Sequence, residues 1–275
     1  MHALKWAFLI GACIYFCALA ATVTFQRALI YVPIGDVKTP QDIGLHSGTD
    51  LTLTTADGEH LHAWYVPPAG DRPLILYFHG NAGTIAGREH RFKKLVANGN
   101  GLLAVEYRGY PGSSGSMGEA GLHADAEAGY QYAMAQQISP KRLIIMGESL
   151  GTGVAIKLAM QHESAALVLD SPYSSVADVA ADRFWFFPAR LFLQDQYRAD
   201  QWIGRVSVPV LMVHGSKDRV IPIRFAEKLF ALANGPKQFI RVSGAGHLAM
   251  GDVLGKVLTW IDQKVPTPAH ASGLK

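Results

Sequence analysis

Cysteine is nearly absent from this 275-residue sequence: it has two, Cys13 and Cys17, and both fall in an apolar N-terminal segment. A disulfide framework or a cysteine-ligated metal site in the rest of the chain is therefore excluded. Charged residues are also sparse, at 17% against 49% apolar residues, which suggests that part of the chain lies in lipid. The 25 Lys and Arg residues are scattered rather than gathered in a run, so nothing indicates nucleic-acid binding.

A charge-free stretch lies near the N-terminus, between Lys5 and Arg27. Its 21 positions (27 − 5 − 1) would form a helix of about 31 Å, close to the roughly 30 Å of a bilayer core. Trp6 and Tyr31 stand near its two ends, where amphipathic rings settle at the headgroup level. We therefore predict that residues 1–30 form a single-pass membrane anchor.

A cleaved signal peptide is the rival interpretation of the same stretch. Lys5 would be its basic region and Ala18-Leu19-Ala20 its cleavage site, which would give a secreted or periplasmic protein. The anchor is favoured because the apolar run continues past that site through Val23 and Phe25. The flanking charges nearly balance, and they give only a slight preference for a cytoplasmic N-terminus with the domain outside.

After the anchor, the hydrophobic pattern is that of an α/β fold. Two alternating segments around the turn signal Asp57-Gly58 predict an antiparallel hairpin at one edge. Short apolar runs separated by helical stretches then predict a mostly parallel sheet covered by helices on both faces. We expect one domain over residues 45–264, with an aromatic-rich cap inserted at about 171–208 and a loose tail at 265–275. The predicted parallel strands are 74–78, 102–107, 143–146, 167–169, 210–213 and 238–242, and the helices are 87–97, 119–137, 151–161, 224–233 and 252–264.

Ser149 is the candidate nucleophile. It stands in Gly147-Glu148-Ser149-Leu150-Gly151, after a predicted buried strand and before a predicted helix. In that setting a serine occupies a sharp turn, and the glycines on either side let strand and helix pack closely while the hydroxyl is exposed. A serine hydroxyl is a poor nucleophile without a base, so a histidine is required as well.

His247 is the candidate base, because it lies in Gly244-Ala245-Gly246-His247, directly after the last predicted strand. The carboxylate that would orient it is Asp218, on the loop after the penultimate strand, which gives the chain order Ser, Asp, His. Asp170, at the end of an earlier strand, is the less favoured alternative for this acid. His79 and His214 are better explained as an oxyanion-loop residue and a packed strand-end residue.

Candidate oxyanion donors come from the turn His79-Gly80-Asn81-Ala82-Gly83 after the first parallel strand. Backbone N–H groups aimed at the developing negative charge would lower the barrier to acyl transfer. The expected pair is the N–H of Asn81 and that of Leu150, the residue after the nucleophile, with Ala82 as the alternative to Asn81.

Together with Tyr107-Arg108-Gly109-Tyr110-Pro111-Gly112-Ser113-Ser114-Gly115, these motifs resemble the α/β-hydrolase superfamily from about residue 50 to 263. More narrowly, they are similar to its membrane-tethered members labelled serine-aminopeptidase-like or lysophospholipase-like. The resemblance implies a hydrolytic Ser149/Asp218/His247 triad with no metal and no organic cofactor. The group includes ester, thioester and lipid hydrolases, but the substrate does not follow from the fold.

Hydrolysis of carboxylic esters or thioesters is the leading expectation, since a tethered enzyme with an apolar cap suits lipid or acylated substrates. A serine peptidase is the runner-up. It is less favoured than an esterase because no acidic cluster that would pair a peptide α-amino group stands near the motifs. A non-catalytic binding protein is less favoured, since no triad residue is missing. Dehalogenase or epoxide-hydrolase chemistry would need an aspartate in place of Ser149.

Overall fold

The computed structural model describes residues 2–265 and contains one eight-stranded sheet. Its order is β1-β2-β4-β3-β5-β6-β7-β8. The strands β1 (Thr49–Thr54) and β2 (His60–Val66) form the expected antiparallel edge, and β2 pairs antiparallel with β4. All pairings from β4 to β8 are parallel, so the predicted α/β class is confirmed. The parallel strands are β3 (Leu74–Phe78), β4 (Gly101–Val105), β5 (Leu143–Glu148), β6 (Ala166–Asp170), β7 (Val210–Gly215) and β8 (Lys237–Val242).

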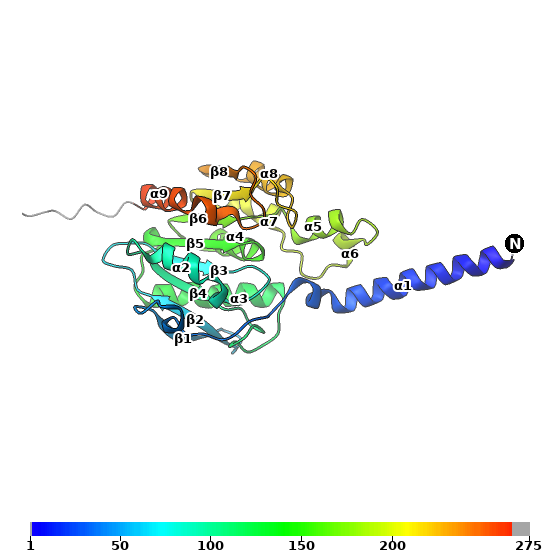
Figure 1. Cartoon of the computed structure of the whole chain (residues 1–275), viewed down its shortest axis with the longest axis horizontal. Helices are drawn as coiled ribbons and strands as arrows, with labels where there is room; N and C mark the ends of the chain where they lie inside the picture. The colour runs from blue at the N-terminus through cyan, green and yellow to red at the C-terminus, as the bar shows by residue number, and fades with distance from the viewer. Residues whose placement is uncertain (1, 266–275) are drawn as a thin grey trace, which may run out of the picture.

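Helices cover both faces of the sheet (Figure 1). The apolar side chains of α3 (Glu119–Ala135), α4 (Leu150–Gln161) and α8 (Ile223–Leu232) pack into one core. Those of α2 (Glu89–Val96) and α9 (Leu254–Lys264) pack into a second core on the opposite face. Every residue of β3, β4, β5, β6 and β7 is buried, as expected for strands between two helical layers. Short 3₁₀ turns at Gln41–Ile43, Ile85–Arg88, Pro140–Arg142, Ile203–Arg205 and Ala249–Val253 complete the connections.

The segment between β6 and β7 carries three short helices at the carboxyl end of the sheet. They are α5 (Val176–Arg183), α6 (Ala189–Phe192) and α7 (Ala199–Trp202), and we call residues 171–208 the cap. The predicted tail falls almost wholly outside the described residues, because their last member is Val265.

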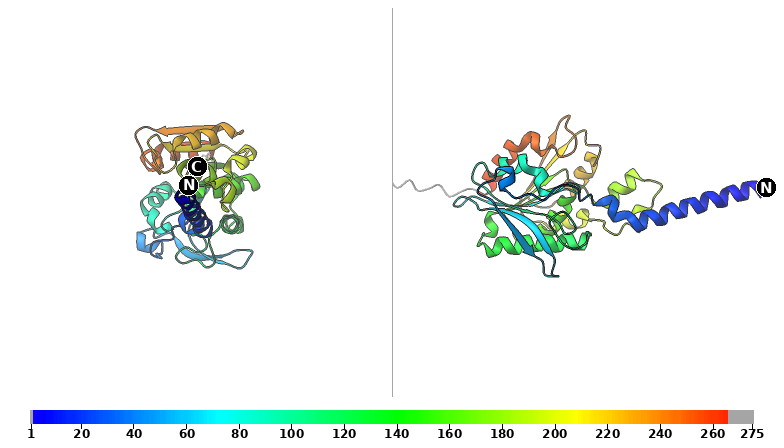
Figure 2. Two further views of the ribbon diagram at one scale, coloured as in Figure 1. Left: turned by 90° about the vertical axis from the view of Figure 1, so that its right-hand side faces the viewer. Right: turned by 60° about the horizontal axis from the view of Figure 1, so that its bottom comes forward.

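The N-terminal helix α1 (His2–Ile30) projects from the domain on the same side as α5 and α6, as both figures show (Figures 1 and 2). Among residues 2–265, it is the one helix that is long and apolar enough to cross a membrane, a test that a signal sequence also passes. Its last turn contacts the cap: the Gln26 side chain is buried, and Arg27 forms a 2.9 Å ion pair with Asp195.

One expectation for this region was wrong. Tyr31 does not lie at a membrane surface, because it is only 1% exposed and belongs to the core of the domain. Its hydroxyl contacts Asp195 at 3.1 Å and Tyr197 at 2.9 Å. A buried tyrosine needs such hydrogen-bond partners, and the cap supplies them.

Candidate active site

Ser149 lies between β5 and α4 in a backbone conformation that is rare for a side-chain-bearing residue, with φ +49° and ψ −117°. The neighbouring glycines are required by close packing. A Cβ at Gly147 would overlap the backbone of Gly151 and Thr152, and a Cβ at Gly151 would overlap the carbonyls of Phe78 and His79. The sequence around Ser149 therefore forms the strained strand-to-helix turn that was predicted from the motif.

His247 and Asp218 approach Ser149 from two loops at the carboxyl end of the sheet. The Nε2 atom of His247 lies 3.0 Å from the Ser149 hydroxyl oxygen, and its Nδ1 atom lies 2.7 Å from Oδ2 of Asp218. These distances allow the imidazole to accept a proton from the serine while the carboxylate fixes its tautomer. The structure thus brings together the three residues chosen from the sequence.

The Asp218 carboxylate is held in its ionised form. Burial alone would raise its pKa, but hydrogen bonds from His214 and His247 and from the backbone N–H of Ile221 outweigh burial and hold this pKa well below its usual range. Its Oδ1 atom accepts from the N–H groups of Val220 and Ile221 at 2.8 and 2.9 Å. His214 is itself fully buried and hydrogen-bonded to the Ile221 carbonyl, as expected for a packed strand-end residue.

Asp170, the alternative acid, has different partners. Its Oδ2 atom forms a 2.7 Å ion pair with Arg91, and its Oδ1 atom accepts from the N–H of Met250 at 3.2 Å. Among the described residues, His247 is hydrogen-bonded to Asp218 and to Ser149 but not to Asp170. The geometry therefore favours Asp218 as the acid.

The two residues expected to supply oxyanion donors lie on different elements, Asn81 on the loop after β3 and Leu150 at the start of α4. Asn81 and Leu150 line the same pocket as Ser149. Leu150 is the first residue of α4, so its N–H has no partner within the helix. Within residues 2–265, the N–H of Asn81 donates to no protein acceptor. Among the described residues, neither of these two backbone N–H groups of the pocket lining donates to a protein acceptor.

Aromatic side chains fix the course of this loop from the β4 side. The Tyr107 hydroxyl donates to the carbonyl of His79 at 2.9 Å, and the Tyr110 hydroxyl donates to that of Asn81 at 2.6 Å. His79 is fully buried, and its Nε2 atom lies 2.8 Å from Glu106. The segment that follows β4 therefore supports the loop that follows β3.

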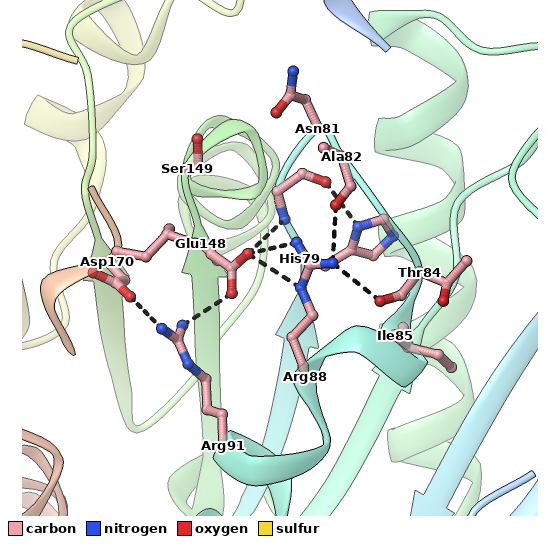
Figure 3. Close-up of polar contacts among 12 residues, drawn as sticks. His79, Asn81, Ala82, Thr84, Ile85, Arg88, Arg91, Glu148, Ser149 and Asp170 are labelled. Atoms are coloured by element: carbon pink, nitrogen blue, oxygen red, sulfur yellow. Dashed lines mark hydrogen bonds and ion pairs between the residues drawn. The ribbon is translucent and has the colours of Figure 1, made fainter. Parts of the chain in front are cut away.

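A buried ionic network, which the sequence did not reveal, supports the loop from below (Figure 3). Arg88 donates to the carbonyls of Ala82 and Thr84 at 2.9 and 3.0 Å and forms a 2.6 Å ion pair with Glu148. Arg91 bridges Glu148 and Asp170 at 3.0 and 2.7 Å. Figure 3 shows the Glu148 carboxylate between the two guanidinium groups, with that of Arg88 toward the loop and that of Arg91 toward Asp170.

Glu148 remains ionised in this buried position. Burial would raise its pKa, but the charges of Arg88 and Arg91 outweigh burial and lower this pKa to about 2. Nothing in Gly-Glu-Ser-Leu-Gly predicts this role, since Glu148 occupies the second position of the motif, where the residue type is variable. No group of three His, Cys, Asp or Glu residues suited to a metal ion occurs in the described part of the chain.

The pocket over Ser149 has a volume of about 190 Å³ and is mostly apolar. The end of α1 forms one wall with Leu29 and Ile30. Helix α5 forms the facing wall, with Phe184 just beyond it. The arrangement can hold an apolar group against the serine hydroxyl. The remaining lining residues are Asn81, Leu150, Tyr173, Val176, Val179, Ala180, Arg183, Val220 and Ile221.

Fold and site define a protein of the α/β-hydrolase class, and comparisons with known proteins agree. The family described as "Serine aminopeptidase, S33" matches residues 70–192. An uncharacterized protein of Mycobacterium tuberculosis is 39% identical over 81% of this chain and 80% of its own. Lysophosphatidylserine lipase ABHD12 of Danio rerio is 34% identical over 76% of this chain and 67% of its own. This chain therefore belongs to the α/β-hydrolase superfamily.

Among solved structures, esterase Pf2001 of Pyrococcus furiosus has a TM-score of 0.69. It is 18% identical, and the match covers 85% of this chain and 96% of the esterase. At that identity the likeness shows the fold.

Proposed function

We propose that this protein is a serine hydrolase that cleaves carboxylic ester or thioester bonds of lipid or other acylated substrates. The observation that carries the proposal is the hydrogen-bonded series Ser149, His247 and Asp218 at the floor of an apolar pocket. A base and an orienting carboxylate within hydrogen-bond reach are what a serine hydroxyl needs to become a nucleophile.

In the proposed reaction, Ser149 Oγ attacks the carbonyl carbon of the substrate as its proton passes to His247 Nε2. The carbonyl oxygen becomes an oxyanion and accepts from the N–H groups of Asn81 and Leu150, each worth about 3 kcal/mol in a typical deletion. Collapse expels an alcohol or thiol, which takes the proton from His247 and leaves an acyl-enzyme. Water activated by the same imidazole then releases the carboxylic acid and restores Ser149.

The lining of the pocket supports an acyl substrate rather than a peptide terminus. Among the described residues that line it, the one charged side chain is that of Arg183, and no carboxylate is present to pair an α-amino group. The related ABHD12 is named as a lysophosphatidylserine lipase, and the fold neighbour Pf2001 is an esterase. Both descriptions agree with cleavage of an ester bond.

Two measurements test the activity. Wild-type protein in detergent is expected to hydrolyse p-nitrophenyl esters, to prefer medium or long acyl chains, and to react with a fluorophosphonate probe. Ser149→Ala should lose both properties, whereas Ser139→Ala, at an exposed position, should keep them. Labelling that persists in Ser149→Ala, or faster cleavage of aminoacyl anilides than of esters, would refute the proposal.

Helix α1 is proposed to be retained as an anchor rather than removed as a signal peptide. The hydroxyl of Tyr15 donates to the carbonyl of Phe186 in the cap at 3.0 Å, and Tyr15 precedes the cleavage signal at 18–20. Cleavage there would discard a contact with the folded domain. The intact mass of the protein purified from membranes decides the matter, because a mass lacking the first 20 residues would exclude the anchor.

A further inference from the structure

The cap exposes a large apolar surface on the loop between α5 and α6 and on α6 itself. The exposed fractions are 85% for Trp185, 57% for Phe186 and 80% for Leu191. Phe184 and Phe192 are also exposed, at 45% and 42%. Contiguous apolar patches of this kind mark a surface that contacts another molecule or a membrane. We call residues 184–192 the aromatic loop.

The aromatic loop runs along α1. At its C-terminal end, the Gln26 side chain donates to the carbonyl of Phe192 at 3.3 Å and accepts from the N–H of Gln194 at 2.7 Å. At its tip, Phe186 accepts the hydrogen bond from Tyr15. Gln26 and Tyr15 are 11 residues apart, which is about 16 Å along a helix. Figure 2 also shows the cap lying beside the near part of α1.

Tyr15 lies in the middle of the charge-free stretch, about 15 Å along the helix from Lys5 and about 18 Å from Arg27. Since a hydrocarbon core is about 30 Å thick, a helix that crosses it with these charges at its two ends places Tyr15 near mid-depth. A residue hydrogen-bonded to Tyr15 cannot then lie outside the bilayer. We propose that the aromatic loop is a second membrane-embedded element, which penetrates the leaflet next to α1.

The backbone of the loop suits this environment. Unpaired backbone groups are costly in hydrocarbon, and here many are paired internally. The N–H groups of Phe184, Phe187 and Leu191 donate to the carbonyls of Ala180, Phe184 and Pro188 at 2.8 to 3.0 Å. The Phe186 carbonyl is paired by Tyr15. The hydrogen bond between Tyr15 and Phe186 therefore satisfies a backbone acceptor at the most apolar level of the membrane.

Two arginines accompany the exposed apolar side chains, Arg183 directly before the aromatic loop and Arg190 within it. Arg183 precedes Phe184 and is exposed, and the Arg190 side chain is 68% exposed although it pairs with Asp178. Basic and aromatic side chains together are typical of segments held at a lipid interface. A bilayer thus fits this surface better than a second copy of the chain, because the patch is continuous with the apolar surface of α1.

Embedding the loop would also set the route of the substrate, a consequence that rests on the proposed function. Leu29, Arg183 and Phe184 line the pocket of Ser149 and adjoin α1 and the aromatic loop. With both elements in the leaflet, the pocket opens toward the headgroup level. An acylated lipid could then pass from the bilayer into the pocket without crossing water.

Quenching by brominated lipids tests the insertion independently of catalysis. Two proteins are reconstituted in vesicles of phosphatidylcholine with or without dibrominated acyl chains. The first is the double variant Ser149→Ala/Trp6→Phe, and the second carries Trp185→Phe in addition. The difference between the two proteins isolates Trp185, since Trp64, Trp202 and Trp260 are common to both. Bromine on the chains is expected to quench most of the Trp185 emission. Equal emission from Trp185 in the two lipids would overturn the insertion. The loop would then be surrounded by water or by another protein rather than by acyl chains.

Activity provides the second arm. The double variant Trp185→Asp/Leu191→Asp changes two exposed residues that do not line the pocket. Hydrolysis of a long-chain ester within vesicles should fall by roughly tenfold or more, because carboxylates are costly in lipid. A soluble short-chain ester should be cleaved at the wild-type rate. The control is Leu232→Asp on α8, which places a carboxylate at an exposed apolar position away from the cap. Leu232 is 42% exposed, and its replacement should change neither rate.

The two arms separate failure of the insertion from failure of the proposed function. Equal losses on both esters would mean that the aromatic loop merely supports the fold, and would contradict its membrane role. Quenching of Trp185 in a protein whose wild type cleaves no ester would uphold the insertion and refute only the hydrolase activity.

Discussion

The side-chain amide of Asn81 donates a hydrogen bond of 2.9 Å to the carbonyl oxygen of Ile30, the last residue of α1. The backbone continues this contact, because the N–H of Val32 donates to the carbonyl of Asn81 at 2.9 Å and the N–H of Gly83 donates to that of Val32 at 3.2 Å. The loop that offers a candidate oxyanion donor is therefore bonded directly to the exit of the N-terminal helix.

Replacement of this amide tests the connection. Asn81→Leu keeps the backbone N–H and the side-chain volume but loses the bond to Ile30, so kcat for a p-nitrophenyl ester should fall about tenfold, less than for loss of a donor. KM should change little. Asn234→Leu is the matched control, because Asn234 makes a similar 2.8 Å bond to the Gly204 carbonyl away from the site. An unchanged kcat in Asn81→Leu would show that the loop does not depend on the side-chain bond to Ile30.

The two candidate acids should behave differently when neutralised. Asp218→Asn loses the carboxylate that holds the tautomer of His247, and kcat should fall by about four orders of magnitude with the fold intact. Asp170→Asn instead weakens the buried pair with Arg91, so it should lower the stability by several kcal/mol and leave kcat of the folded protein near wild type. Ester hydrolysis and urea unfolding in detergent measure the two effects. The opposite pattern would assign the acid to Asp170.

Tyr110→Phe examines the support of the loop from the β4 side. The change removes one hydroxyl, which donates to the carbonyl of Asn81 at 2.6 Å. A net loss of about 1 kcal/mol of stability is expected for such a bond, together with a several-fold lower kcat because the loop is less rigidly held. Tyr130→Phe, whose hydroxyl donates to the Glu163 carbonyl at 3.2 Å, serves as control and should affect stability alone. Equal kcat values for the two variants would contradict a role in positioning.

The network around Glu148 predicts a defined dependence of stability on pH. The pKa of Glu148 is about 2 in the folded protein and about 4.3 in an unfolded chain. Because the folded-state pKa is the lower one, ionised Glu148 stabilises the fold above pH about 4.3, and this contribution is lost as the pH falls toward 2. The urea midpoint of the wild type should therefore drop steeply across that interval.

Glu148→Gln removes this contribution at neutral pH and leaves Arg88 without its carboxylate, so the free energy of unfolding should fall by about 3 to 5 kcal/mol at pH 7. Its urea midpoint should then depend less on pH between 4 and 2. Glu89→Gln is the control, because Glu89 is paired with Lys93 at the surface and its loss should have little effect. A variant with the same acid dependence as the wild type would exclude Glu148 as the titrating group.

The sequence was sufficient to predict the fold class, the positions of the strands along the chain, and the three residues Ser149, His247 and Asp218 that the structure brings together. Each of these follows from local signals: apolar runs, glycines, and polar residues just after a strand. The Glu148 network was not predictable, because Arg88 ends a 3₁₀ turn, Arg91 lies on the short polar helix α2, and their partner is 57 to 60 positions away. Tyr31 was misplaced for the same reason, since its partners Asp195 and Tyr197 are 164 and 166 positions later.

The ion pair between Arg27 and Asp195 also orders events during synthesis. Arg27 emerges from the ribosome 168 residues before its partner, so the end of α1 cannot reach its final contacts until the cap has been translated. Leu29 and Ile30, which form one wall of the pocket, are held in place by those contacts. A nascent chain already attached to a membrane would thus carry an open, incomplete pocket until more than two thirds of the 275 residues had been translated.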